Sequence, residues 1–95
     1  MYARMVIGEA IHEDQVSEFV RIYQSEVLPK LHDEPGFESA NFMVEDGGRT
    51  AISLTLWQSQ QDCLKYHSSR AYRQLADKTQ HLLKGAFIVR LFRTV

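Results

Sequence analysis

Residues 35–59, PGFESANFMVEDGGRTAISLTLWQS, contain the clearest local signal in the chain. After the Pro-Gly pair, which ends a helical region, residues 37–44 divide into two alternating sets of side chains, as the two faces of a strand do. The run EDGGR that follows contains glycines, which tolerate the positive φ angles of a tight reversal. Residues 50–57 are rich in β-branched and large apolar side chains, which favour strands. The stretch therefore predicts a β-hairpin whose strands are residues 37–44 and 50–57.

The N-terminal third predicts a strand followed by a helix. Residues 2–11 have strand spacing, with apolar side chains on both alternating faces. From residue 12 to residue 31, apolar side chains recur at three- and four-residue steps, which is the period of an amphipathic helix. Pro29 lies inside this helix and lacks a backbone N–H, so we expect a kink or a break there.

The C-terminal third predicts a second helical region and a last strand. Ser59 opens the region as a helix cap, and Ser68 or Ser69 provides a second cap inside it. We therefore expect this helix, which ends at Gly85, to be bent or split. The apolar side chains of residues 86–95, AFIVRLFRTV, have the spacing of a strand.

The order β-α-β-β-α-β predicts the α+β class and a single domain over residues 1–95. It matches the split βαβ arrangement of ferredoxin-like folds, with a four-stranded antiparallel sheet and both helices on one face. The first, third and fourth strands carry apolar side chains on both faces, which is typical of a sheet buried on two sides. We therefore expect a homodimer in which a second copy covers the open face around a two-fold axis, as in a dimeric α+β barrel.

Composition excludes several classes of partner. Eleven Lys and Arg residues against twelve Asp and Glu residues give a net charge of -1, without the basic excess of a nucleic-acid binder. No apolar run approaches the roughly 20 residues of a membrane-spanning helix, and charged residues come too early for a signal peptide. We expect a cytoplasmic protein that binds neither nucleic acid nor membranes.

The sequence also predicts that the protein uses no metal and no cofactor. Cys63 is the only cysteine and cannot form an intramolecular disulfide, while the four histidines are too scattered for a zinc site. The common phosphate-binding, dinucleotide-binding and hydrolase motifs are absent. We interpret Cys63 as a small buried hydrophobic residue.

Four features, met in order, resemble the antibiotic biosynthesis monooxygenase family of dimeric α+β barrels. These are the entry Pro35-Gly36-Phe37 to a strand, a strand that ends at Trp57-Gln58-Ser59, a helix with His67 followed by Tyr72, and a closing strand. The resemblance covers nearly the whole chain. The family includes cofactor-independent oxygenases of hydroxylated aromatics or quinols, haem-degrading enzymes, and small proteins without an established activity.

The haem-degrading branch of this family has its own residue pattern. It uses an Asn near the end of the first strand, a Trp nine residues after the Trp of the third strand, and a His ten residues later. The corresponding positions in this chain hold Ile7 or Gly8, Tyr66 and Ala76. The resemblance therefore predicts no haem degradation by that route.

Six side chains are candidates for lining a substrate pocket between the helices and the sheet: Asn41, Met43, Trp57, Tyr66, His67 and Tyr72. The resemblance implies a catalytic role for His67, whose ordinary pKa of roughly 6.5 suits removal of a proton from a phenol. The alternative for His67 is a structural role, as a hydrogen-bonded histidine at the break in the helix. Trp57 either stacks on a planar substrate or closes the core, and we favour the core. The two tyrosines either donate hydrogen bonds to a substrate oxygen or pack on the helix face.

Arg90 interrupts the apolar C-terminal strand. It either balances an anion in a pocket or pairs with Glu9 across the sheet, and we expect the pair.

Two hypotheses for function remain open. The first is a homodimeric, cofactor-independent monooxygenase that oxidises a small hydroxylated aromatic or quinol with dioxygen, with His67 as the base. The second is a non-catalytic or stress-associated dimeric barrel that holds a small apolar molecule in the same pocket. An RNA-binding sheet is disfavoured because the last strand lacks the basic and aromatic pattern of such sheets.

Overall fold

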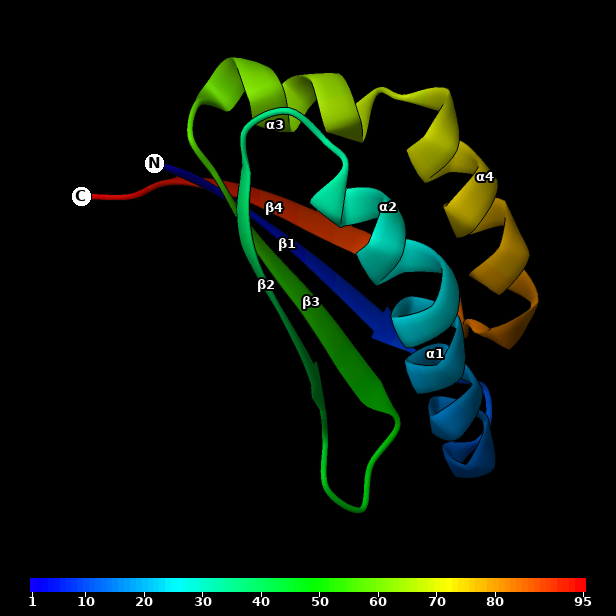
Figure 1. The fold of residues 1–95 in the computed structure, drawn as a ribbon. Helices are drawn as coiled ribbons and strands as arrows, with labels where there is room; N and C mark the ends of the chain where they lie inside the picture. The colour runs from blue at the N-terminus through cyan, green and yellow to red at the C-terminus, as the bar shows by residue number, and fades with distance from the viewer.

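The computed structural model describes residues 1–95, and all four strands belong to one sheet. The elements in chain order are β1 (Tyr2–Glu9), the 3-10 turn η1 (Glu13–Gln15), α1 (Val16–Ile22), the π-helical turn η2 (Tyr23–Val27), α2 (Leu28–His32), β2 (Phe37–Val44), β3 (Thr50–Trp57), α3 (Gln60–His67), α4 (Arg70–Thr79), the 3-10 turn η3 (Gln80–Leu82) and β4 (Ile88–Arg93). The sheet order is β2-β3-β1-β4, with every neighbouring pair antiparallel. Figure 1 shows the helices on one face of this sheet and no element on the other. The predicted α+β, ferredoxin-like fold is confirmed.

The hairpin of β2 and β3 has the predicted bounds. Its turn closes with a hydrogen bond from the Glu45 amide to the Thr50 carbonyl, at 2.9 Å. Gly47 adopts a φ of 68°, which is the left-handed conformation that the run EDGGR predicted. The outer strand β4 is shorter than predicted because its only neighbour is β1, whose first residue, Tyr2, pairs with Arg93.

Cross-strand register divides the strand residues between two faces. On the face toward the helices, Arg4 lies opposite Thr55 and Val6 opposite Ser53. Met5 alternates with them and therefore lies on the uncovered face. Side chains two residues apart share a face, so one choice of register assigns every strand residue to a side.

The first helical region runs from η1 through α2 and contains the irregularity that Pro29 predicted. The Leu28 amide donates to the Tyr23 carbonyl, five residues back, in place of the usual four. This π-helical turn lies directly before Pro29, which cannot donate to the turn above it and whose ring crowds that turn. The helix absorbs the proline by widening one turn and does not break.

The second helical region is split as predicted. The Ser59 hydroxyl oxygen accepts a hydrogen bond from the Asp62 amide at 3.1 Å and caps α3. The Ser69 hydroxyl oxygen accepts one from the Tyr72 amide at 3.1 Å and caps α4. The break between the two caps changes the direction of the chain, so α3 crosses one end of the sheet while α4 runs along its helix-covered side (Figure 1).

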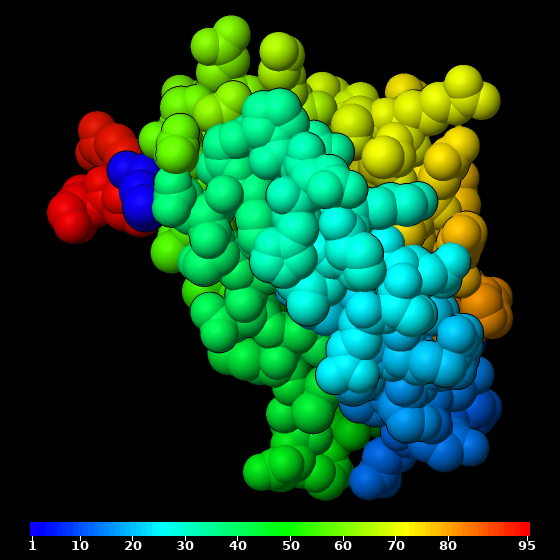
Figure 2. Space-filling view, viewed as in Figure 1, coloured from blue at the N-terminus to red at the C-terminus, as the bar shows by residue number.

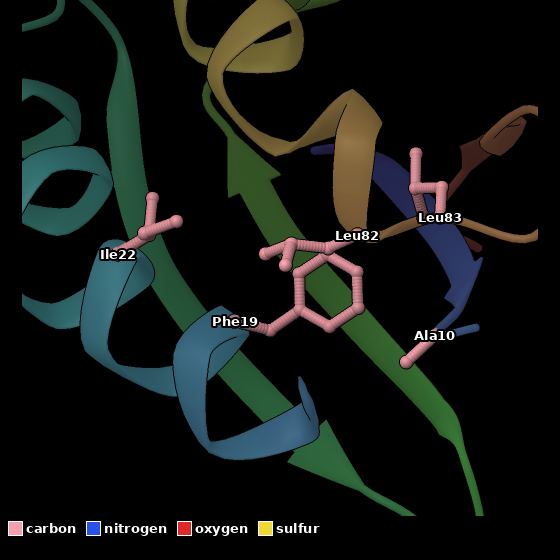
Figure 3. Packing of buried hydrophobic residues seen from close by; sticks show 5 residues of the cluster. All are labelled: Ala10, Phe19, Ile22, Leu82 and Leu83. Carbon is pink, nitrogen blue, oxygen red and sulfur yellow. The ribbon is translucent and has the colours of Figure 1, made fainter. Parts of the chain in front are cut away.

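The core consists of two clusters at opposite ends of the layer between helices and sheet. The first joins α1 to the end of β1 and to the segment after α4, and Figure 3 shows the Phe19 ring against Leu82. The second contains the fully buried Trp57 with Leu31, Cys63 and Tyr66. Figure 2 shows the side chains of the first helical region packed over the sheet, with the two chain termini side by side at one edge. None of the helices is long and apolar enough to cross a membrane.

Gly36 connects the first helical region to β2, and its place is specific to glycine. Its φ is 79°, and a Cβ at this position would overlap with the Asp62 side chain at the start of α3. Gly47 has a similar φ of 68° but open space around it. We expect Gly36→Ala to lower the free energy of unfolding by about 3 kcal/mol and Gly47→Ala by about 1 kcal/mol, because only the first adds steric overlap to backbone strain. Urea denaturation measures both, and equal losses would contradict the overlap.

Candidate functional site

A cavity of about 90 Å³ lies between the helices and the helix-covered face of the sheet. At roughly 10–15 Å³ for each water, this is room for a small organic molecule and not for one water alone. Thirteen of the eighteen residues around it are hydrophobic, and the lining comes from the helices, from β1, β2 and β3, and from Phe87 just before β4. An apolar cavity with few polar groups is typical of a ligand-binding site.

Arg4 is the charged residue in the wall of this cavity. It lies near the start of β1 and exposes 3% of its surface. Its Nε donates a hydrogen bond to His67 Nδ1 at 3.1 Å, and its guanidinium carbon lies 4.1 Å from the centre of the Tyr72 ring. Its Nη2 is buried and has no hydrogen-bond partner.

No carboxylate neutralises Arg4. The three ion pairs of the protein are Arg21–Glu18, Arg49–Glu9 and Lys78–Glu26, and all lie among exposed or half-buried side chains. Arginine cannot relieve its burial by losing a proton, because its pKa is too high. The cavity wall therefore carries a full positive charge.

His67 is the last residue of α3 and lies outside the cavity wall, where it contacts two of the lining residues, Arg4 and Tyr72. Its Nδ1 accepts the Arg4 hydrogen bond, so a neutral ring carries its proton on Nε2, as inferred from this contact. Burial, and secondly the charge of Arg4, lower the pKa of His67 below its usual 6.5. The ring stacks on Tyr72 at a centroid distance of 5.8 Å. His67 is therefore neutral near pH 7.

The aromatic candidates form one continuous row of contacts beside the cavity. The Trp57 and Tyr66 rings stack at 5.2 Å, and Tyr66 contacts Tyr72 at 5.7 Å. Both tyrosines line the cavity, whereas Trp57 lies behind them, fully buried, with its Nε1 donating to Thr55 Oγ1 at 3.0 Å. Trp57 thus closes the core, as we favoured, and burial raises the pKa of Tyr66 to about 12.

Asn41 and Met43 lie away from the other candidates. They pair with Leu54 and Ile52 on the uncovered face of the sheet, and both are exposed. Their neighbour Phe42 faces the cavity instead. Because alternate strand residues point to opposite faces, Asn41 and Met43 do not contact a ligand in the cavity of their own chain.

The expected pair between Arg90 and Glu9 was wrong. Glu9 pairs with Arg49, at 3.0 Å, and lies beyond the point where β4 begins to follow β1. Arg90 is exposed on the uncovered face, opposite Met5.

The prediction for Cys63 is confirmed, since the residue is fully buried and burial raises the pKa of its thiol.

Sequence reasoning missed two polar residues of the site, Arg4 and Tyr23. Arg4 interrupts the apolar run of the first strand just as Arg90 interrupts the last, so the same signal was present. Tyr23 looked like one member of an apolar helix stripe. Its hydroxyl is buried in the cavity wall and makes no well-formed hydrogen bond; burial raises its pKa, and the nearby Ser53 side chain partly offsets that rise. No group of three or more His, Cys, Asp or Glu side chains is placed to hold a metal ion.

Comparison with known proteins agrees with this architecture. The family model "antibiotic biosynthesis monooxygenase" matches residues 4–78. No match to a curated protein sequence was found.

Many solved structures are similar in fold. The monooxygenase ActVA-Orf6 of Streptomyces coelicolor, in complex with nanaomycin D, has a TM-score of 0.87 and 16% identity over 99% of this chain and 87% of that one. A mutant of SnoaB, a cofactor-independent oxygenase from Streptomyces nogalater, has a TM-score of 0.78 and 15% sequence identity. The match covers 98% of this chain and 92% of SnoaB. Rv0793 from Mycobacterium tuberculosis has a TM-score of 0.78 and 14% sequence identity, and the match covers 100% of this chain and 96% of Rv0793. At these identities the likeness to solved structures establishes the fold alone.

The contact between Arg4 and His67 predicts a measurable pKa difference. NMR titration should place the imidazole pKa of His67 below 6.5, and Arg4→Met should raise it, because the variant removes a nearby positive charge. The matched control Arg73→Met, at an exposed site on α4, should leave it unchanged. A wild-type pKa above 6.5 would contradict the structure.

The same shift makes stability depend on pH. The unfolded chain binds a proton at His67 more readily than the folded one, so unfolding takes up a proton in the window below about pH 6.5. The stabilisation is fully present above that pH and is lost as the pH falls through the folded-state pKa.

Proposed function

The chain belongs to the antibiotic biosynthesis monooxygenase family, whose model spans residues 4–78, and we propose that it is a cofactor-independent monooxygenase of a small hydroxylated aromatic or quinol. The observation that carries this proposal is a largely apolar cavity whose wall holds three tyrosine rings and one buried cation, Arg4. The Streptomyces neighbours, a monooxygenase in complex with nanaomycin D and a cofactor-independent oxygenase, support the same reading.

The chemistry needs no group beyond the substrate and dioxygen. A phenol that has lost its proton is rich in electrons and can reduce dioxygen directly. Oxidation of a phenol to a quinone consumes one dioxygen and releases one water, with the substrate supplying all the electrons. The tasks of the protein are then to hold the ring, to exclude water, and to favour the ionised form.

His67 is the proposed base for this ionisation. Its depressed pKa keeps the imidazole neutral and able to accept a proton near pH 7. In the structure the lone pair on Nδ1, the only one that the neutral ring offers, already accepts the hydrogen bond from Arg4 Nε. Proton transfer to Nδ1 therefore requires that this hydrogen bond open when substrate is bound.

Oxygen uptake tests the catalytic proposal. At least one member of a panel of quinols and hydroxylated polycyclic aromatics should consume dioxygen without added metal or flavin. His67→Ala should lower that rate by roughly 10²-fold, as expected for loss of a general base. His81→Ala, at an exposed histidine, is the matched control and should keep the full rate. An active enzyme whose His67→Ala variant keeps full turnover would remove the assigned role.

The alternative is a ligand-binding protein without turnover. One observation favours it, namely that His67 is not part of the cavity wall and already has a hydrogen-bond partner. Tight binding of a panel member without oxygen uptake by any member would select this alternative.

We also propose that the working form is a homodimer joined through the uncovered face of the sheet. This face carries apolar side chains on all four strands: Met5, Ile7, Met43, Ile52, Leu54, Leu56, Ile88 and Phe92. Ile88 and Phe92 each expose 47% of their surface and Met43 exposes 44%. An apolar area of this extent is unusual for a monomer in water and fits a second copy of the same surface.

Light scattering behind a sizing column should give about twice the 11.0 kDa mass of the chain. Ile88→Glu should abolish this species and cause aggregation or unfolding, because it places a charge on the apolar face. Leu64→Glu, at an exposed leucine of α3 on the helical side, should keep the dimer. A stable wild-type monomer at micromolar concentration would refute the proposal.

A further inference from the structure

Arg4 is a buried cation that no anion of the protein neutralises. It exposes 3% of its surface, and its contacts are a neutral imidazole and two neutral phenol rings, with the guanidinium carbon 4.1 Å from the centre of Tyr72 and 5.5 Å from that of Tyr66. An unpaired buried charge is strongly destabilising unless a counter-charge or a full set of hydrogen bonds compensates it. These contacts fall short of that, because Nη2 has no partner.

A second buried polar atom without a hydrogen bond lies in the same cavity wall as Arg4 Nη2. Arg4 and Tyr23 both line the cavity, and the two buried side-chain polar atoms of the protein without a hydrogen-bond partner are Arg4 Nη2 and Tyr23 Oη. Both atoms can donate a hydrogen bond. The Ser53 side chain lies close enough to Tyr23 to lower its pKa, which leaves Arg4 Nη2 as the donor that most needs an acceptor from a ligand in this largely apolar cavity.

The guanidinium is held in one orientation. The hydrogen bond from Nε to His67 Nδ1 fixes one edge of the guanidinium plane, and the Tyr72 ring packs against it. The Nη edge is the part left for a ligand, and it suits an oxygen that carries negative charge. The tyrosine rings beside it suit the flat face of an aromatic ring.

We propose that Arg4, through Nη2, binds a negatively charged oxygen on the aromatic ring of the ligand, so that the cavity selects aromatic anions over their neutral analogues. The choice of an aromatic phenolate as substrate rests on the proposed function, whereas the anion site stands on the geometry of Arg4. In the enzyme, this contact stabilises the ionised substrate before dioxygen reacts with it, which makes Arg4 a catalytic residue as well as a binding residue.

The test compares two probes that differ in one methyl group. 4-Nitrophenol ionises to a phenolate near neutral pH, and its methyl ether, 4-nitroanisole, has the same ring and no charge. At pH 8, calorimetric titration should show that the wild-type protein binds the phenolate at least about 10-fold more tightly than the ether, as expected for one charge-assisted hydrogen bond. The bound nitrophenol should also ionise at a lower pH than the free compound, which its phenolate absorbance reports.

Arg4→Met should abolish the preference for the phenolate while binding of the ether persists, and Arg73→Met should change neither affinity. The comparison of the two probes in the wild-type protein needs no variant, so it tests the proposal even where Arg4→Met fails to fold. Equal affinity for both probes, no binding of either, or an unchanged preference in folded Arg4→Met would each overturn the anion site.

Binding and turnover separate the two proposals. Preference for the phenolate without oxygen uptake on any panel member would keep the anion site and reject the monooxygenase. Oxygen uptake by a protein that binds both probes equally would keep the monooxygenase and reject the anion site.

Discussion

The antiparallel pairing of β1 with β3, in the middle of the sheet, determines which side chains the helices cover. With Arg4 opposite Thr55 and Val6 opposite Ser53, the even-numbered residues of β1 face the helices and build the cavity. A register shifted by one residue would send Arg4 to the open face and bury Met5 in its place. The site, the core and the open apolar face all follow from this one alignment.

The same alignment places an arginine where folding alone gives it no stabilising anion. A methionine of similar length would satisfy the apolar surroundings of position 4 at lower cost, as replacement of buried ion pairs by apolar side chains does elsewhere. The protein retains the charge beside an empty volume of about 90 Å³. Binding sites commonly contain such locally unfavourable groups, because the ligand supplies the missing interaction.

Local sequence predicted the elements well because their signals act over a few residues. Glycines in the run EDGGR, the serine caps at Ser59 and Ser69, and the proline within the first helix each act on backbone groups within about four positions. The order of elements then selected the ferredoxin-like topology, since few connections of these strands avoid crossings. The sequence did not predict that the irregularity before Pro29 is a π-helical turn. A kink, a break and a widened turn all have the same local cause, namely a proline without a backbone N–H.

The candidate site was predicted less completely, and the reason is physical. Tyr66 and His67 at the end of α3 and Tyr72 in the first turn of α4 are separated by only a few residues, so the chain itself keeps them close together. Asn41 and Met43 were placed in the pocket on strand spacing alone, which shows that two residues share a face but not which face meets the helices. That decision belongs to the tertiary structure, as does the meeting of Arg4 with His67 across 63 positions of sequence. Local chemistry in the chain determined the strands, helices and caps, and only the packing of the sheet against the helices brought one buried charge to the cavity.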